Sequence, residues 1–178
     1  LLIAFAPQIK SEFNLTNVQW GLLTGVYFLF FYSVFGIFMG LLGDKFSRMK
    51  IAAAGVFLWS LMTAFTGVAK NFSHLIVARA LIGVGESALT PNAISMLSDL
   101  FKQNQRGTAS AIYYLGIPLG VGFGMLIAAF FGPAYGWRSV FITLGLIGMG
   151  LGILTYFLLE PRRGKLDLSF DVDNKSTS

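Results

Sequence analysis

The run VARALIGVGESALTP, Val77 to Pro91, carries an arginine and a glutamate seven residues apart among apolar side chains. At about 100° per residue, seven residues fall about 20° short of two helical turns, so Arg79 and Glu86 share one helix face about 10 Å apart. They are too far apart to pair closely without neighbours. Arg79 is suited to attract an anionic group and Glu86 to exchange a proton, because burial and a nearby arginine act in opposite directions on the proton affinity of a carboxyl group. The alternative is a buried pair that braces two helices.

Glu86 lies deep in the helix that this run predicts. Counted from Ser73 at about 1.5 Å per residue, Glu86 is about 20 Å inside a helix of about 42 Å, and Arg79 is about one and a half turns from the outer end. A charge at the centre of a membrane-spanning helix costs about 2.5–3.5 kcal/mol, so such residues normally face a bundle interior or a wet cavity. Arg79 can extend outward to water, but Glu86 cannot. We therefore expect hydrated space around Glu86.

A second charged cluster stands in GLLGDKFSRMK, Gly40 to Lys50, where a small-residue helix end meets one acidic and three basic residues. A solvated basic loop would explain the basic residues but not Asp44. Asp99, at the end of a later helix, offers Arg48 a second acidic partner. Partly buried pairs resist screening by salt better than exposed ones. We predict a charge network between inner helix ends that latches one conformation, made of Gly40, Asp44, Lys45, Arg48, Asp99 and Arg106.

The composition indicates which elements must carry these residues. Hydrophobic residues make up 55% of the 178 residues and charged residues 12%, about half the charged share of a soluble domain. A helix needs about 20 apolar residues to cross a membrane. The sequence therefore predicts an all-α membrane protein with a helical bundle over residues 1–160, comprising five complete spans at about 19–43, 51–69, 73–101, 107–131 and 138–159 and the last turns of an earlier helix at 1–6.

The connections between these spans are short. Pro7 to Val18 is expected to be a polar outer connection that ends in a helix cap at Thr16 or Asn17, and Ser73 is the expected N-cap of a later span. After Glu160 the composition changes to PRRGKLDLSFDVDNKSTS. Residues 161–178 are therefore predicted to form an aqueous linker.

Small residues and prolines recur inside the spans. Glycines four residues apart form one stripe along a helix and let two backbones approach closely, and an internal proline removes a backbone donor and bends its helix. Static packing and a sliding interface are both open readings of these positions. The predicted packing and hinge residues are Gly83, Gly85, Pro91, Gly116, Pro118, Gly120 and Gly124.

The basic residues indicate the orientation of the chain. Five spans place the earlier helix end and the tail on opposite sides of the membrane. The tail side collects Lys45, Arg48, Lys50, Lys102, Arg106, Arg162, Arg163, Lys165 and Lys175, and the other side has only Lys10, Lys70 and Arg138. Basic loops stay cytoplasmic, so the tail is predicted to be a cytoplasmic linker. The net charge of +5 then reflects topology, and the expected partners are membrane lipids and not nucleic acid.

Several classes of function lack their residues. Cysteine is absent and there is one histidine, His74, so neither a disulfide framework nor a thiolate metal site is expected. No Ser/His/Asp set, phosphate loop or metal-ligand cluster is present. The sequence predicts no enzyme, no cofactor and no metal.

Two motifs carry a resemblance to a known family. GLLGDKFSRMK resembles the signature G-x-L-a-D-r-x-G-r-k of the major facilitator superfamily, although Ser47 replaces its last glycine and the final basic residue is displaced to Lys50. RALIGVGES is similar to a second signature of that superfamily, R-x-x-x-G-x-G. Together with the Ile-Pro-Leu-Gly run, these motifs most resemble the Spinster-like branch. The matching residues are Gly40, Leu42, Asp44, Lys45, Arg48, Arg79, Gly83 and Gly85.

The resemblance implies a twelve-helix secondary transporter in which two six-helix halves enclose a substrate site and work by alternating access. This chain then supplies the first half without most of its first helix, and the missing C-terminal six-helix half is an expected partner. Spinster relatives export lysolipids or sphingoid phosphates. The resemblance therefore implies a small or lipid-like substrate, with protons as the coupling ion, and gives Arg79 and Glu86 roles toward substrate and proton. The expected location is a bacterial inner membrane.

Two other functions fit the same features. One is an organic-anion symporter or a drug exporter of the same superfamily. The other is a membrane scaffold or partial gene product that transports nothing and associates through its glycine faces.

Overall fold

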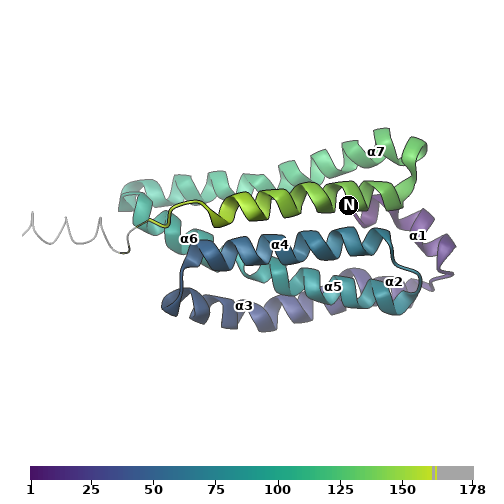
Figure 1. Cartoon of the computed structure of the whole chain (residues 1–178), viewed down its shortest axis with the longest axis horizontal. Helices are drawn as coiled ribbons and strands as arrows, with labels where there is room; N and C mark the ends of the chain where they lie inside the picture. The colour runs from purple at the N-terminus through teal and green to yellow at the C-terminus, as the bar shows by residue number, and fades with distance from the viewer. Residues whose placement is uncertain (162, 164–178) are drawn as a thin grey trace, which may run out of the picture.

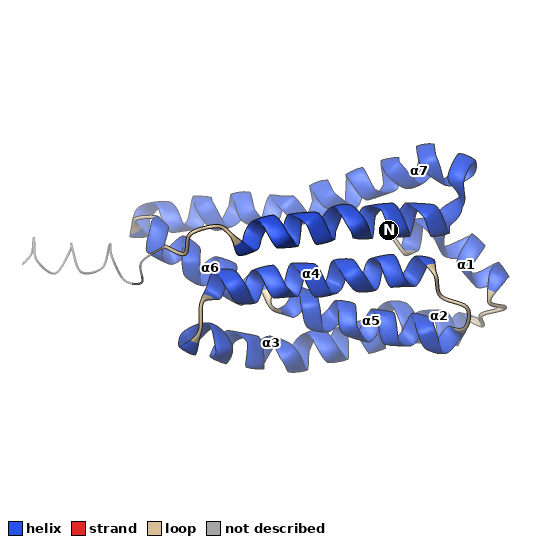
Figure 2. Cartoon of the chain, viewed as in Figure 1, coloured by secondary structure: helices blue, strands red, loops and turns tan. Residues whose placement is uncertain are grey.

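The computed structural model describes residues 1–161 and 163. Within these residues the chain is helical and contains no strand, as Figure 2 shows. A π-helical turn, η2, joins α2 to α3 in one continuous segment. The elements in chain order are η1 Ile3–Phe5, α1 Ala6–Glu12, α2 Asn17–Gly21, η2 Leu22–Val26, α3 Tyr27–Lys45, α4 Arg48–Gly67, α5 Phe72–Ser87, α6 Leu89–Leu100 and α7 Gln103–Tyr156.

Helix α7 consists of two antiparallel arms. At about 1.5 Å per residue a straight helix of this length would run about 80 Å, twice the thickness of a bilayer. Gly136 breaks it with φ 73° and ψ 160°, a conformation that a side chain would disfavour. Figure 1 shows the second arm returning beside the first. The two arms account for two of the five predicted spans.

The helices form one bundle in which α4 and α5 lie at the centre. The most extensive contacts join α4 to α7, while α5 packs against both α3 and α4. At the end of the bundle that the sequence predicts to be outer, η1, α1 and the second arm of α7 enclose an apolar cluster that includes Phe5, Ile9 and Phe141. The bundle therefore holds α5, with its two charges, between two neighbouring helices.

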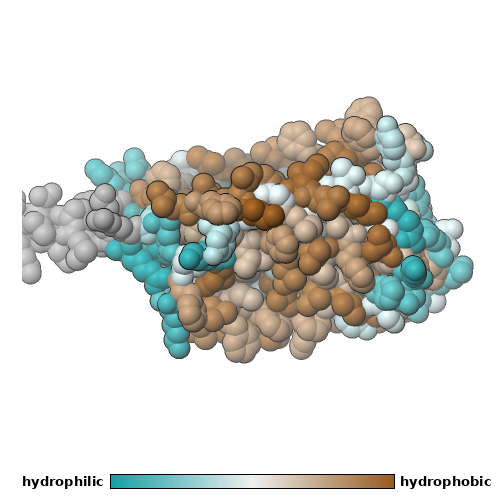
Figure 3. Space-filling view, in the orientation of Figure 1, coloured by the Kyte–Doolittle hydropathy of each residue, from teal (hydrophilic) through white to brown (hydrophobic). Residues whose placement is uncertain are grey.

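The surface is that of a membrane protein. Four helical segments are long and apolar enough to cross a bilayer: Asn17–Lys45, Arg48–Gly67, Phe72–Leu100 and Gln103–Tyr156. Figure 3 shows a broad apolar band between two hydrophilic ends of the molecule. This band confirms the predicted all-α membrane fold.

The predicted boundaries need correction at both ends of several spans. The chain is helical from Ile3 to Glu12, so the helical segment predicted at 1–6 continues past Pro7 and the connection predicted from Pro7 begins only after Glu12. Pro7 lies in the first turn of α1, where its missing N–H has no helical partner to lose. The spans predicted at 51–69 and 107–131 instead begin at Arg48 and Gln103, and the last span ends at Tyr156.

Two of the predicted helix N-caps can be compared with the structure. Thr16 caps α2 and forms a capping box with Gln19, which confirms the predicted start. The N-cap of α5 is Asn71 and not Ser73, since the Asn71 side chain accepts the His74 amide at 2.9 Å. Pro161 and Arg163 are the described part of the predicted linker; residue 162 and residues 164–178 lie outside the described residues.

The glycines fall into packed and open groups. Gly83 lies against the backbone of α3, and Gly145, Gly148 and Gly152 lie against α4. Gly40 is looser, since a Cβ there would be 3.9 Å from Pro91. The predicted stripe on the first arm of α7 is different, because Cβ atoms at its glycines would meet nothing within 4 Å in the described chain. That stripe comprises Gly116, Gly120 and Gly124.

The two prolines in the predicted hinges behave differently. Pro91 lies in the first turn of α6, and the helix is interrupted just before it, between Ser87 and Leu89. At Pro118 the backbone keeps helical angles, and Gly136 is the non-helical residue of α7. Neither of these two prolines therefore coincides with non-helical backbone angles, since Ala88 at the interruption before Pro91 has φ −74° and ψ −26°.

Candidate functional site

Arg79 is the charged residue that α5 directs at the neighbouring segment η2–α3. Its Nε donates a hydrogen bond to the Leu23 carbonyl oxygen at 3.4 Å, and its guanidinium lies 4.8 Å from the centre of the Phe28 ring. The side chain is only partly exposed. The guanidinium has five donors, and one of them makes this hydrogen bond.

The close approach of α3 and α5 depends on Gly83. A Cβ on Gly83 would lie 2.7 Å from the Phe28 carbonyl oxygen and 3.2 Å from the Tyr32 amide nitrogen. Phe28 and Tyr32 stack with ring centres 5.7 Å apart. The small residue one turn after Arg79 thus lets the guanidinium reach η2.

Glu86 lies in the last turn of α5, directly before the interruption at Ala88. Its side chain is half-buried and forms no hydrogen bond or ion pair with the described residues. It is close enough to Arg79 for an electrostatic interaction, yet the two do not pair directly. The geometry keeps a carboxylate and a guanidinium on one helix without neutralising either by direct contact.

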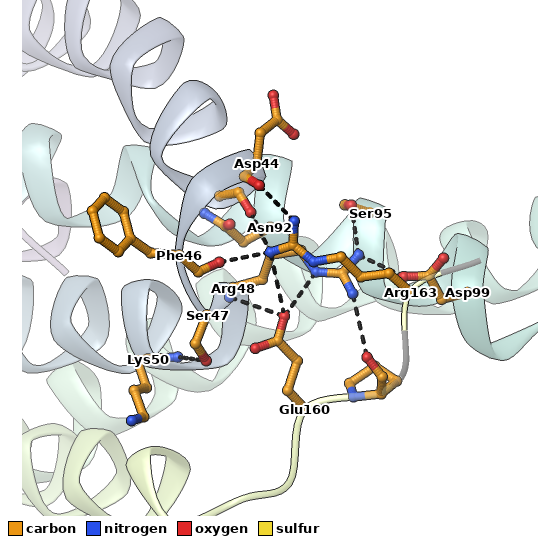
Figure 4. A network of polar contacts seen from close by, with 12 residues as sticks. Asp44, Phe46, Ser47, Arg48, Lys50, Asn92, Ser95, Asp99, Glu160 and Arg163 are labelled. Carbon is orange, nitrogen blue, oxygen red and sulfur yellow. Dashed lines mark hydrogen bonds and ion pairs between the residues drawn. The ribbon is translucent and has the colours of Figure 1, made fainter. Parts of the chain in front are cut away.

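The helix ends that the sequence predicts to be inner meet at Arg48. This buried side chain contacts Asp99 at 2.6 Å and Glu160 at 3.0 Å, and it also donates to the Ser95 hydroxyl at 2.9 Å. Arg48 therefore joins the start of α4 to α6 and to the segment after α7, as Figure 4 shows.

Glu160 and Arg163 extend this network to α3. Arg163 donates to the carbonyl oxygens of Gly43, Asp44 and Phe46 at 2.8, 2.6 and 2.7 Å, which are among the carbonyls left without helical donors at the end of α3. It also lies 3.8 Å from Glu160. Burial by itself would raise the pKa of Glu160, but hydrogen bonds from Ser47 and Arg48 outweigh it and hold that pKa below its ordinary value.

Only some of the residues predicted for the inner network take part in it through their side chains. The Arg48–Asp99 pair is present, whereas Asp44 takes part through its backbone carbonyl and its carboxylate points away from the cluster in Figure 4. Lys45 is exposed, and Arg106 donates to the Phe101 carbonyl oxygen at 3.2 Å.

Glu160 and Arg163 were missed because they follow the last span. The acidic residue at the end of an apolar run, followed by Pro161 and basic residues, is the signal that could have identified them.

A separate cluster closes the outer end. Arg138 contacts Glu12 at 2.6 Å and donates to the carbonyl oxygens of Gly67 and Ala69 at the end of α4. Trp137 donates its indole N–H to Glu12 at 2.8 Å. The hydrogen bond from Arg138 is the main cause that lowers the pKa of Glu12 below its ordinary value. This cluster was not predicted, since Glu12 lies more than a hundred positions from Trp137 and Arg138.

Comparison with known protein families identifies the family of the chain that has these charged residues at the two ends of the bundle and on α5. The profile described as Major Facilitator Superfamily matches residues 1–176. The chain belongs to the major facilitator superfamily. Of the first signature, Arg48 and the Asp44 carbonyl lie in the inner network. The second signature lies along α5, where Arg79 meets η2 and Gly83 meets α3.

Similar curated proteins include Spinster proteins and a probable L-galactonate transporter. Protein spinster of Drosophila melanogaster is 32% identical over 93% of this chain and 27% of its own length. The sphingosine-1-phosphate transporter SPNS2 of Danio rerio is 33% identical over 89% of this chain and 32% of its own length. The probable L-galactonate transporter of Escherichia coli is 30% identical over 86% of this chain and 34% of its own length. The chain spans about a third of the length of these relatives.

A solved structure shows the same arrangement of helices. The crystal structure of a bacterial homolog of the human lysosomal transporter Spinster, in an inward-facing and occupied conformation, superposes with a TM-score of 0.80 at 30% identity. The match covers 93% of this chain and 42% of that chain. This superfamily member is therefore Spinster-like, and its bundle corresponds to the N-terminal helical bundle of such transporters.

Proposed function

We propose that this chain is part of a proton-coupled secondary transporter for an amphiphilic organic anion. Arg79 attracts the acidic head group of the solute, and Glu86 carries the proton. The apolar part of the solute then packs beside aromatic side chains such as Phe28. Alternating access requires a second six-helix half, which lies against the face of this bundle that includes the open glycines of α7.

The single observation that carries this proposal is that neither charged side chain on α5 has a strong partner among the described residues. Arg79 makes one long hydrogen bond to a backbone carbonyl, and Glu86 makes no hydrogen bond or ion pair with the described residues. Two half-buried charges without strong internal partners are costly inside a membrane unless a ligand or water meets them. A bracing ion pair would have joined them directly.

The inner network has a proposed role of its own. Arg48, Asp99 and Glu160 tie three inner helix ends together, while the Asp44 carboxylate points outward and remains available to another part of the transporter. We assign this network to an inner gate and the tail to the cytoplasmic side of a bacterial inner membrane.

A second candidate solute is a small hydrophilic acid. The probable L-galactonate transporter of Escherichia coli is 30% identical to this chain, and a carboxylate would bind a guanidinium as a phosphate does. Sphingosine 1-phosphate and L-galactonate both carry an acidic group, but only sphingosine 1-phosphate has a long apolar chain. Comparing their uptake therefore distinguishes an amphiphilic solute from a small hydrophilic one.

Transport into liposomes tests the proposal. The protein that contains this chain is reconstituted, and uptake of each of the two solutes is measured with and without an imposed pH gradient. We expect the gradient to stimulate uptake in the unmodified protein but not in Glu86→Gln, because the amide cannot carry a proton. Arg79→Gln is expected to lower uptake of either acid at least tenfold, since a charge-assisted hydrogen bond is lost.

Lys70→Gln is the matched control, because it removes an exposed outer cation and should leave uptake unchanged. If the gradient stimulates Glu86→Gln as strongly as the unmodified protein, Glu86 is not the proton carrier. If neither acid is taken up, the assignment to anionic solutes is wrong.

A further inference from the structure

The π-helical turn η2 takes from one backbone carbonyl oxygen the donor that it would have in an α-helix. The Tyr27 amide donates to the Leu22 carbonyl oxygen, five residues back, whereas an α-helix would direct it to Leu23. Leu23 is fully buried, so water cannot satisfy this oxygen cheaply. The donor that reaches it is Nε of Arg79, at 3.4 Å.

Two other features near the turn concern its freedom to move. Thr24 donates its hydroxyl to the Trp20 carbonyl oxygen at 2.8 Å, a back-bond that bends helices. Cβ atoms at Gly21 and Gly25 would meet nothing within 4 Å. The outer end of this span can therefore turn on this side without colliding with the described chain.

The geometry points to a switch in which Arg79 holds η2 in its π form until an anionic ligand draws the guanidinium away. The Leu23 oxygen then loses its donor and is satisfied when Tyr27 donates to it, which converts the turn to α-helix. Because a π turn holds one residue more than the α turn it replaces, α2 rotates by about 100° relative to α3. The ligand class is an organic phosphate or carboxylate, so this inference rests on the proposed function.

The rotation has a measurable size. A side chain about 5 Å from a helix axis that turns by about 100° moves by about 8 Å. Val18, on α2, is 72% exposed, and Val77, on α5, is 49% exposed, so both accept spin labels without disturbing the core. Val34 lies beyond the turn on α3 and serves as the matched control. The chain has no cysteine of its own, so introduced cysteines label these sites alone.

Distances between paired spin labels test the switch in the protein that contains this chain. We expect Arg79→Gln, without any ligand, to shift the Val18→Cys/Val77→Cys distance by several ångströms and to leave the Val34→Cys/Val77→Cys distance unchanged. Arg79→Lys is expected to behave as the unmodified protein, because its ammonium can also donate to the Leu23 oxygen. Sphingosine 1-phosphate at saturation should produce the Arg79→Gln shift in the unmodified protein.

The outcomes separate the switch from the proposed function. An unchanged Val18–Val77 distance in Arg79→Gln overturns the switch, as does an equal shift of both label pairs, which would report general unfolding. A shift in Arg79→Gln with none on adding sphingosine 1-phosphate or L-galactonate supports the link between Arg79 and η2 and counts against anionic solutes as ligands.

Discussion

Gly55 on α4 and Gly85 on α5 each lie against the carbonyl oxygen of the other. A Cβ on Gly55 would be 2.6 Å from the Gly85 oxygen, and a Cβ on Gly85 would be 2.8 Å from the Gly55 oxygen. Gly83 on the opposite side meets α3 in the same way. The two glycines of the R-x-x-x-G-x-G run therefore face two different helices and hold α5 between them.

Gly85→Ala is expected to destabilise the bundle by about 1–3 kcal/mol, because the new methyl group meets backbone atoms that cannot move aside. This cost exceeds the gain of up to about 1 kcal/mol in helix propensity. Thermal unfolding in detergent measures the change. Gly120→Ala, where the methyl group meets nothing in the described chain, should be neutral or stabilising, and equal effects of the two would contradict the packing.

Asp99→Asn is expected to destabilise the inner end because it leaves Arg48 buried with one acidic partner instead of two. Breaking a buried pair costs about 3–5 kcal/mol, and the remaining Glu160 should keep the loss near the lower limit. Asp44→Asn is the matched control, with an expected change below about 0.5 kcal/mol. Denaturant unfolding of the two variants compares them; a larger effect of Asp44→Asn would refute the arrangement at Arg48.

The contact between Glu12 and Arg138 should make the stability of the protein depend on pH. The pKa of Glu12 in the folded protein is below its ordinary value of about 4.5, chiefly because Arg138 donates a hydrogen bond to it. A carboxyl group with a lowered pKa contributes its stability above the ordinary value and loses it as the pH falls through the folded pKa. Below about pH 4.5 the unfolding temperature should therefore fall.

Glu12→Gln should remove this part of the acid dependence. The pair is 35–43% exposed, so screening by water limits its contribution to less than about 1 kcal/mol. Unfolding temperatures at pH 3 to 7, compared for the two proteins, provide the measurement. Parallel curves would show that Glu12 makes no such contribution.

Asn71→Ala is expected to destabilise α5 by about 1 kcal/mol, since it removes the side-chain acceptor of the His74 amide. Ser73→Ala should change stability by less than half of that, because Ser73 lies inside the first turn. Thermal unfolding of the two variants distinguishes them. A larger loss of stability in Ser73→Ala than in Asn71→Ala would indicate that Ser73 is the N-cap.

Much of the fold could be predicted from residue order. Apolar runs of about 20 residues fix the spans, since an unpaired backbone cannot remain in hydrocarbon. The spacing of Arg79 and Glu86 along one helix follows from its pitch alone. The Thr16 capping box was also readable, because all its atoms come from four consecutive residues. The boundaries were less accurate where Pro7 lies in the first turn of a helix and where α7 begins at Gln103, before the apolar residues.

The partners of the charged residues were decided by tertiary structure. Arg48 meets Glu160 across more than a hundred residues, Arg138 meets Glu12, and Arg79 meets the Leu23 carbonyl oxygen, whose α-helical donor Tyr27 bonds to Leu22 instead. The sequence by itself determined that charges would lie within a helical membrane bundle, because composition and helical period are local properties. Which atoms satisfy those charges depended on how the helices pack, since glycine contacts such as Gly55 with Gly85 set the distance and rotation of each helix against its neighbours.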